Sequence, residues 1–399
     1  MSSPQADLRW SDRARELRNR LFASPRFQRW ATRFFPTRPI ARRSARRLFD
    51  LCAGFVYSQV LLACVQLDLF DVLSEGPQTV SRLATRLDLS TEAARRLLKA
   101  AASLELVESR GGDRFGLGPL GAAFRGNPGI AAMVEHHALL YADLTDPLAL
   151  LRGEIETTQL SRYWPYARNA RSTPDAPDSD ADTVTGKGKG ASDAAPALGR
   201  DRVAGYSALM SASQALVADQ ILGLVPLTRH RCLLDVGGGD GTFLEAAARR
   251  APGLRLMLFD FPSVAGLARE RFERAGLGGR AEAIGGDFRI DPLPEGADIV
   301  SLVRIVHDHD DEAALALLRA VHRALPAGGV LLLAEPMSGT AGAEPVGDAY
   351  FGLYLLAMGS GRPRSPQELC ALVRAAGFGE TRLVPTPMPL QTGLLIARA

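Results

Sequence analysis

The chain has 399 residues, of which 46% are hydrophobic, and its formal net charge is only +3. This length favours two domains, the apolar share supports sizeable cores, and the small net charge does not by itself indicate a nucleic-acid partner. The four cysteines stand in apolar runs without metal-ligand spacing, so we expect buried free thiols in a reducing compartment: Cys52, Cys64, Cys232 and Cys370. The N-terminus lacks an apolar signal core, and no uncharged apolar run reaches the roughly 20 residues of a transmembrane helix. These features predict a cytoplasmic protein that is either soluble or peripheral to a membrane.

Residues 1–47 form a basic arm with interleaved aromatic side chains. The first 50 residues hold thirteen arginines and four acidic residues. Arginines mixed with Trp and Phe are typical of a segment that lies on an anionic membrane surface. A solvated, partly disordered arm is the other interpretation, and the sequence leaves both open.

Residues 48–167 read as a helical domain. The run from Leu48 to Leu73 is apolar nearly all round and predicts buried helices. Two short amphipathic helices follow, meeting at "LDLS", where Ser90 or Thr91 can cap the second. A hairpin turning at Gly111–Gly112 completes a winged-helix arrangement. Such a unit either binds DNA, here through Arg95, Arg96 and Lys99, or serves only in packing and dimerisation, which the rest of the chain favours.

Residues 168–202 separate this domain from the remainder. The stretch 168–200 is rich in Ser, Asp, Ala, Gly and Pro, which predicts a flexible insertion or linker.

From residue 203 the chain forms a third part in which strands alternate with helices. Apolar runs such as "RCLLDV", "LRLMLFD", "ADIVSLVRI" and "GGVLLLAEP" are typical of strands buried on both faces. Regular alternation predicts an α/β, doubly wound, Rossmann-like parallel sheet, and the final two strands without a helix between them predict an antiparallel edge.

A glycine-rich loop, Asp235 to Gly241, follows the first strand of this sheet. It fails the dinucleotide fingerprint, because residue 242 is Thr, and it lacks the Lys of a phosphate-binding loop. It does fit D-x-G-x-G-x-G, in which Asp235, Gly237, Gly239 and Gly241 allow a tight turn and close approach of a ligand.

Acidic and aromatic residues end the next two strands. A carboxylate at Asp260 can accept both hydroxyls of a ribose, while Asp287 and Phe288 can meet the edge and the face of a base. A sugar site and a base site without a phosphate site indicate S-adenosylmethionine. We place Arg304, at the end of the fourth strand, among the same cofactor-binding candidates.

The stretch "RIVHDHDDE" follows the fourth strand. Asp308 or Asp310 can cap the next helix, and Asp311 and Glu312 suit its first turn. No convergent ligand set is apparent, so we expect no metal. A histidine at a strand end beside a methyl donor is suited to act as a general base for an alcohol.

In order and spacing, the motifs "LLDVGGGDGTF", "FDFPSV", "GGDF", "HDHDDE" and "LLLAEPM" resemble the S-adenosylmethionine-dependent O-methyltransferases of the caffeic-acid and hydroxyindole type. The resemblance implies that the winged helix dimerises, that His307 is the general base and that Glu335 orients it. It also implies that Met210 lines the acceptor pocket. Two positions depart from that family: His309 stands where Trp is usual, and Pro363 stands where a second acid is usual. Because the dyad then has one acid, a mechanism driven by proximity without His307 stays open.

Further stretches narrow the resemblance, among them "MVEHHALLYADLTDPLALLRGE" and "GDAYFGLYLLAMGSGRPRSP". They are similar to the hydroxyneurosporene (demethylspheroidene) O-methyltransferases of purple photosynthetic bacteria. This implies a tertiary hydroxyl at the end of an acyclic carotenoid as acceptor, a homodimer, and membrane contact through residues 1–47. His137, Tyr350 and Tyr354 are candidate pocket residues, although helical stripes of this kind are often core. The alternatives are a phenolic or polyketide acceptor, or a winged-helix DNA-binding regulator that senses S-adenosylmethionine.

Overall fold

The structure is a computed structural model that describes residues 10–163, 211, 213–390 and 392–399. The predicted linker at 168–200 and the pocket candidate Met210 lie outside the described residues. The described chain divides into two compact units, residues 1–126 and 127–399. The domain boundaries expected from the sequence stay predictions.

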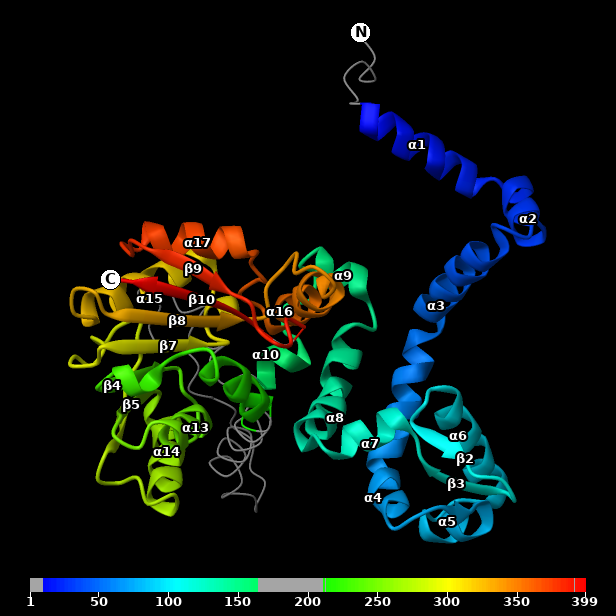
Figure 1. Ribbon diagram of the computed structural model, residues 1–399, viewed down its shortest axis with the longest axis horizontal. Helices are drawn as coiled ribbons and strands as arrows, with labels where there is room; N and C mark the ends of the chain where they lie inside the picture. The colour runs from blue at the N-terminus through cyan, green and yellow to red at the C-terminus, as the bar shows by residue number, and fades with distance from the viewer. Residues whose placement is uncertain (1–9, 164–210, 212, 391) are drawn as a thin grey trace, which may run out of the picture. The chain divides into compact units, whose positions relative to one another are not determined.

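The first unit is helical with one small sheet (Figure 1). Its helices are α1 Trp10–Ala23, α2 Pro25–Arg33, α3 Arg38–Gln66, α4 Leu69–Ser74, α5 Val80–Arg86, α6 Thr91–Ser103 and α7 Pro119–Arg125. Its strands are β1 Gln78–Thr79, β2 Val107–Ser109 and β3 Arg114–Leu117, in the order β1-β3-β2 with antiparallel pairing. The predicted cap of α6 is confirmed, because the Ser90 hydroxyl accepts from the Ala93 amide at 3.1 Å. The winged-helix arrangement of α5, α6 and the β2–β3 hairpin is therefore present.

The basic residues on α6 are engaged by acidic neighbours. Arg95 pairs with Asp113, whose hairpin position brings the carboxylate to the helix, and Arg96 pairs with Glu92. This neutralises part of the charge that a DNA-reading helix would need.

The expectation that the apolar run beginning at Leu48 is buried is wrong for α3. Only Cys64 and Val65 of this helix are buried, while Leu51 is 81% exposed and Phe55 67% exposed. Cys52 is likewise exposed rather than buried. Among the described residues, α3 is the one helix long and apolar enough, by length and composition alone, to cross a membrane. The uncharged part of this run, between Asp50 and Asp68, is shorter than the roughly 20 residues on which the expectation from the sequence was based, so that expectation stays as it was.

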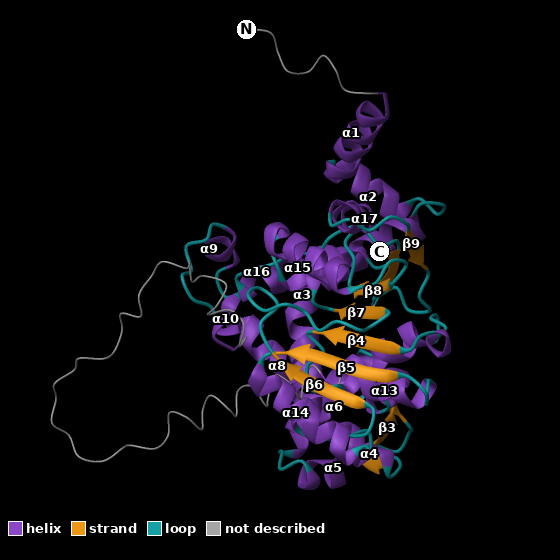
Figure 2. Ribbon diagram, turned by 90° about the vertical axis from the view of Figure 1, so that its left-hand side faces the viewer, coloured by secondary structure: helices purple, strands orange, loops and turns teal. Residues whose placement is uncertain are grey.

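The second unit contains a seven-stranded sheet in the order β6-β5-β4-β7-β8-β10-β9. Its strands are β4 Cys232–Val236, β5 Arg255–Asp260, β6 Ala281–Gly285, β7 Ile299–Val303, β8 Val330–Glu335, β9 Thr381–Val384 and β10 Gly393–Arg398. The strands β4 to β8 are parallel, as the arrows in Figure 2 show. Strand β10 runs antiparallel to both β8 and β9. The predicted doubly wound sheet with an antiparallel edge is confirmed.

Helices cover both faces of this sheet. The α-helices are α8 Pro128–Asp143, α9 Pro147–Leu151, α10 Gln159–Tyr163, α13 Thr242–Arg250, α14 Pro262–Arg274, α15 Asp311–Ala324, α16 Gly352–Met358 and α17 Pro366–Ala375. The short 3-10 helices are η1 Leu227–Arg229 and η2 Val306–Asp308, and η3 Pro345–Phe351 is a π-helix. Helices α13 and α14 pack on one face, and α15 and α17 pack on the other. Alternate residues of a strand point to opposite faces of the sheet, so Leu233 and Leu234 of β4 lie in the cores on opposite faces. The residues on both faces are apolar because helices cover both.

The predicted N-cap position of α15 is confirmed at Asp310, but the expected capping bond is absent. Asp310 is the N-cap residue, but its side chain makes no cap bond and accepts instead from the Gly361 amide at 3.0 Å. The start of this helix is therefore tied to a segment fifty residues further along the chain.

Candidate functional site

The glycine loop between β4 and α13 adopts the conformation that its sequence predicts. Gly237, Gly239 and Gly241 have φ angles of 71°, 61° and 83°, which favour glycine. A Cβ at Gly237 would lie 2.5 Å from the Ile305 side chain, whereas a Cβ at Gly239 would meet nothing within 4 Å. The loop thus packs tightly against the sheet while its Gly239 backbone opens into a cavity.

Two carboxylates support this loop in different ways. Asp235 is buried beneath it, where the Ser301 hydroxyl donates to Oδ1 at 2.6 Å and Oδ2 has no partner among the described residues. Burial raises the pKa of Asp235 to about 7, and nearby Asp260 adds to this, although the Ser301 bond opposes it. Asp260 accepts from the amides of Gly239 at 2.9 Å and Phe261 at 2.7 Å. It therefore braces the loop and lines the cavity as well.

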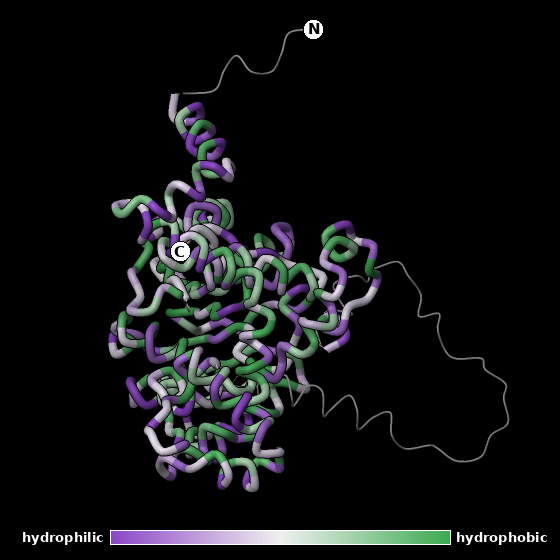
Figure 3. The backbone as a smooth tube through the Cα atoms, turned by 90° about the vertical axis from the view of Figure 1, so that its right-hand side faces the viewer, coloured by the Kyte–Doolittle hydropathy of each residue, from purple (hydrophilic) through white to green (hydrophobic). Residues whose placement is uncertain are grey.

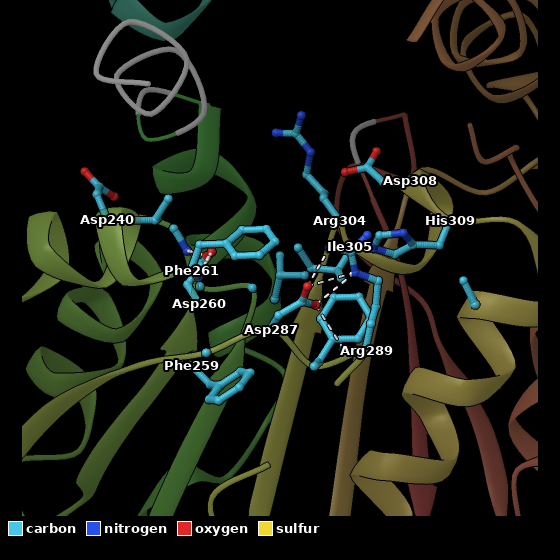
Figure 4. Close-up of a pocket in the computed structure, with 18 of the residues that line it drawn as sticks. Asp240, Phe259, Asp260, Phe261, Asp287, Arg289, Arg304, Ile305, Asp308 and His309 are labelled. Carbon is cyan, nitrogen blue, oxygen red and sulfur yellow. Dashed lines mark hydrogen bonds and ion pairs between the residues drawn. The ribbon is translucent and has the colours of Figure 1, made fainter. Parts of the chain in front are cut away.

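The cavity has a volume of about 260 Å³ and lies over the carboxyl ends of the parallel strands. Of the predicted cofactor residues, six line it: Gly237, Gly239, Asp260, Asp287, Phe288 and Arg304. Asp235 and Gly241 do not line it and support the loop from behind. In Figure 4, Asp260 and Phe261 lie on one side and Asp308 and His309 on the other.

An ion pair and an aromatic pair form the wall where a base is expected. Arg289 donates to both oxygens of Asp287, at 2.9 and 3.1 Å from Nε. Burial pushes the pKa of Asp287 upward, but the bonds from Arg289 outweigh it and the pKa is lowered. The Phe288 ring meets the His309 ring edge to face, with centroids 5.2 Å apart.

Sequence reasoning missed several lining residues, including Phe261, Arg289 and His309. Phe261 follows the predicted site residue Asp260, and Arg289 follows Phe288. Their position next to predicted site residues in the sequence could have identified both. His309 was noticed only as a departure from the usual Trp.

These features fit the adenosine part of S-adenosylmethionine. The open backbone at Gly239, the Asp260 carboxylate and the Phe288 ring offer contacts for a ribose and a base without a phosphate site. Among the described residues, no group of three His, Cys, Asp or Glu side chains has the arrangement of a metal site.

His307 and Glu335 meet after the ends of β7 and β8, next to Asp308, which lines the cavity. The ring Nδ1 of His307 hydrogen-bonds Glu335 Oε2, while Glu335 Oε1 accepts from the amides of Ile305 at 3.1 Å and Val306 at 2.7 Å. The sequence-predicted base and acid are therefore in contact. His307 is 5% exposed and is not among the residues that line the cavity, whereas Asp308 is.

Arg304 directly follows β7 and lines the cavity. It is a non-glycine residue with φ of 60°, held by a bond from its amide to Ala334 O at 2.8 Å. Its guanidinium donates to the Ser213 hydroxyl at 2.7 Å and, in Figure 4, extends away from the sheet.

A strap from Ser360 to Arg364 fixes the turn that carries His307. The Arg364 guanidinium is 2% exposed and donates to Val306 O and His309 O, each at 2.7 Å, and to the Asp311 carboxylate. The Arg362 amide donates to His307 O at 2.9 Å. Pro363, where a second acid was expected by resemblance, lies within this strap and supplies no acid.

Two histidine–tyrosine pairs join α8 to η3 and α16. His136 Nε2 and the Tyr354 hydroxyl are 2.8 Å apart, and so are His137 Nε2 and the Tyr350 hydroxyl. The two tyrosine rings stack at 5.8 Å, and Phe351 between them lies 5.7 Å from the His307 ring. The structure thus brings the candidates His137, Tyr350 and Tyr354 together near His307, and it adds His136.

Comparison with known proteins gives two domain matches. Residues 49–126 match an O-methyltransferase dimerisation domain, and residues 193–379 match an O-methyltransferase domain.

Curated relatives cover most of the chain. It is 46% identical to demethylspheroidene O-methyltransferase of Cereibacter sphaeroides, over 93% of this chain and 91% of that protein. It is 39% identical to demethylspheroidene O-methyltransferase of Rhodobacter capsulatus, over 90% of this chain and 83% of that protein. These two relatives favour neither the phenolic nor the DNA-binding alternative.

A solved structure supports the fold. Human N-acetylserotonin methyltransferase in complex with SAM superposes with a TM-score of 0.70, at 23% identity, over 89% of this chain and 97% of that one.

Proposed function

The chain belongs to the S-adenosylmethionine-dependent O-methyltransferase family, and we propose that its acceptor is the tertiary hydroxyl at the end of an acyclic 1-hydroxy carotenoid. The observation that carries this proposal is the 46% identity to a demethylspheroidene O-methyltransferase over nearly the whole chain. The chemistry would serve the biosynthesis of spheroidene- or spirilloxanthin-type carotenoids.

Residues at the strand ends hold the donor in this proposal. S-adenosylmethionine, when bound, supplies a sulfonium methyl group that an oxygen nucleophile can accept. Asp260 receives the ribose hydroxyls while it braces Gly239, and Phe288 packs on the base with Asp287 at its edge. Asp235, Gly237 and Gly241 keep the loop in the shape that this requires. Arg304, at the acceptor end of the cavity, suits the carboxylate of the donor.

A second group of residues is proposed to hold the carotenoid acceptor, both its hydroxyl group and its apolar chain. His307, oriented by Glu335, is the general base that takes the hydroxyl proton in this proposal. Tyr350, Tyr354 and His137 form a wall for the polyene, and Met210 is proposed for the same pocket. Because a tertiary alcohol is a crowded and weakly acidic nucleophile, alignment with the methyl group contributes more than basicity.

An assay with labelled S-adenosylmethionine and a 1-hydroxy carotenoid tests the function. The wild-type enzyme should methylate the carotenoid and show little transfer to a simple phenol. His307→Ala should lower kcat by at least tenfold, since it removes the partner of buried Glu335. Transfer to the phenol alone would overturn the acceptor, and near-wild-type turnover of the variant would remove His307 from its role.

We also propose that α1 and α2 lie on an anionic membrane. Phe22, Phe27, Trp30 and Phe34 form a continuous row of ring contacts, with centroids 4.8 to 5.9 Å apart. The ends of this row are exposed, and arginines flank it. Figure 3 shows hydrophilic and hydrophobic residues interspersed along α1. Such a helix can bind lipid through both charge and apolar contact, at the membrane where a carotenoid resides.

Vesicle co-sedimentation tests this membrane contact. The full chain should bind vesicles with anionic lipid and bind neutral vesicles less, because the arginines supply part of the attraction. Deletion of residues 1–45 should abolish binding; unchanged binding of the truncated protein would contradict the proposal.

A further inference from the structure

Arg289 lies in the wall of the cavity, beside the residues proposed for the base of the donor. Its guanidinium holds the carboxylate of Asp287, because Nε donates to both oxygens and Nη2 donates to Oδ2 at 2.5 Å. The backbone amide of Arg289 donates to Oδ1 at 3.0 Å as well. The backbone and the side chain of one residue thus hold the same carboxylate, so the two side chains form a single fixed unit.

The Arg289 guanidinium is also held against an aromatic ring. Its Cζ lies 5.9 Å from the centroid of the Phe261 ring, a distance typical of a cation–π contact. Phe261 directly follows β5 and Asp287 follows β6, so Arg289 joins the ends of two neighbouring strands. All three residues line the cavity, and Figure 4 shows them in its wall. The guanidinium is therefore kept at the cavity, although a free arginine side chain would extend into water.

This ion pair leaves hydrogen-bonding capacity on both partners. Three N–H groups of Arg289 reach the Asp287 carboxylate, which offers about four lone-pair sites. On the guanidinium, the second hydrogen of Nη2 and both hydrogens of Nη1 have no bond to any residue that the structure describes. The pair thus presents an acceptor, from Asp287, directly beside a donor, from Arg289.

We propose that Arg289 is a further cofactor-binding residue, which reads the adenine base together with Asp287. The adenine amino group is a hydrogen-bond donor, and the ring nitrogens on either side of it, N1 and N7, are acceptors. Asp287 accepts from the amino group, and Arg289 donates to the ring nitrogen next to it. This rests on the placement of the base against Phe288 in the proposed function.

Arg289 removes two unfavourable effects that a lone carboxylate would have at this position. A ring nitrogen that loses its water on binding stays unsatisfied without a donor, and its lone pair would face the negative charge of Asp287. Burial raises the pKa of Asp287, but the bonds from Arg289 outweigh this and lower the pKa, so the carboxylate stays an acceptor at neutral pH. Arg289 therefore supplies the missing donor and keeps its partner ionised.

Calorimetry with S-adenosylhomocysteine tests this contact without any turnover. Two analogues, in which N1 or N7 of the base is replaced by a C–H group, each remove one acceptor. The wild type should bind one of them about tenfold more weakly than S-adenosylhomocysteine, which is the effect of losing a hydrogen bond to a charged group. Arg289→Met should weaken the binding of S-adenosylhomocysteine by a similar factor, and its advantage over that analogue should disappear.

The pattern across the three ligands separates reading of the base from a merely structural role. If Arg289 only braces Asp287, Arg289→Met will weaken the binding of all three ligands by the same factor, and the proposal is overturned. Equal binding of the three ligands by the wild type, or tighter binding of S-adenosylhomocysteine by the variant, would overturn it too. In the expected result, the weaker analogue identifies the ring nitrogen that Arg289 meets.

Arg249→Met is the matched control. Arg249 forms an ion pair with Glu245 at 2.7 Å on α13 and does not line the cavity, so this substitution removes the same charge from a different place. The variant should bind all three ligands as the wild type does. A loss equal to that of Arg289→Met would attribute the effect to net charge and overturn the proposal.

Phe288→Ala checks the placement of the base on which the inference rests. Loss of the stacked ring should weaken the binding of all three ligands alike, by about tenfold. Unchanged binding would show that the base lies elsewhere and would overturn the role of Arg289 with it. A wild type that methylates no hydroxy carotenoid would refute the proposed acceptor alone, because these binding measurements involve no acceptor.

Discussion

Gly361 is the residue on which the turn carrying His307 closes. A Cβ there would lie 2.1 Å from His307 O, and its φ of 79° disfavours side chains. Gly361→Ala should therefore cost about 2–4 kcal/mol of unfolding free energy through strain and overpacking. It should also lower kcat, because Asp308 and His307 share this turn. Urea unfolding measures the first effect, and Gly253→Ala, with nothing within 4 Å, is the control. Equal stability of the two variants would contradict this account.

Asp235 should impose a pH dependence on stability. Its pKa is about 7 in the folded chain and about 3.9 in an unfolded one, so the folded state binds the extra proton between these values. Unfolding free energy should then fall as pH rises from about 4 to 7. Asp235→Asn removes this contribution. The difference in unfolding free energy between variant and wild type should therefore change by roughly 4 kcal/mol at most between pH 4 and 8. Parallel pH profiles from urea unfolding would show that Asp235 is ionised throughout.

At the scale of elements, the sequence predicted what is local and periodic. Strands such as β4 are buried throughout and apolar except for Asp235, and the glycines after β4 adopt positive φ, so both features could be expected. The strap from Ser360 to Arg364 could not, because its bonds to the His307 turn join residues some fifty positions apart. The contact between His307 Nε2 and Asp308 Oδ1, 3.1 Å apart, was also missed, because extended backbone would direct neighbouring side chains to opposite sides whereas both residues lie in the 3-10 helix η2.

The hydroxyl groups of Tyr354 in α16 and Tyr350 in η3 hydrogen-bond histidines of α8, and a phenylalanine at either position would lack them. Tyr354→Phe removes the hydroxyl that hydrogen-bonds His136 Nε2 and leaves a buried imidazole nitrogen unsatisfied. We expect a loss of about 1–3 kcal/mol in unfolding free energy. Tyr350→Phe should cost less, because His137 is only partly buried and water can replace the hydroxyl. Chemical unfolding measures the unfolding free energy of both variants. A larger loss in Tyr350→Phe than in Tyr354→Phe would contradict this prediction.

For the whole molecule, α3 shows the limit of sequence patterning. Its apolar residues look like those of a core helix, yet they are exposed in a single chain. An apolar pattern states that a surface must be covered, but not whether the cover comes from the same chain, a second copy or lipid. The match of residues 49–126 to a dimerisation domain favours a second copy.

An aspartate in the exposed face of α3 should therefore dissociate the homodimer. Phe55 is 67% exposed in one chain, and a charge buried against a partner helix would be strongly unfavourable. Light scattering after gel filtration should give twice the 42.7 kDa chain mass for the wild type and the chain mass for Phe55→Asp. Phe35→Asp, outside the matched domain, should leave the dimer intact because Phe35 is 85% exposed and precedes α3. A wild-type protein that stays in solution only with detergent would instead indicate that lipid covers α3, and a dimeric Phe55→Asp would show that the interface lies elsewhere.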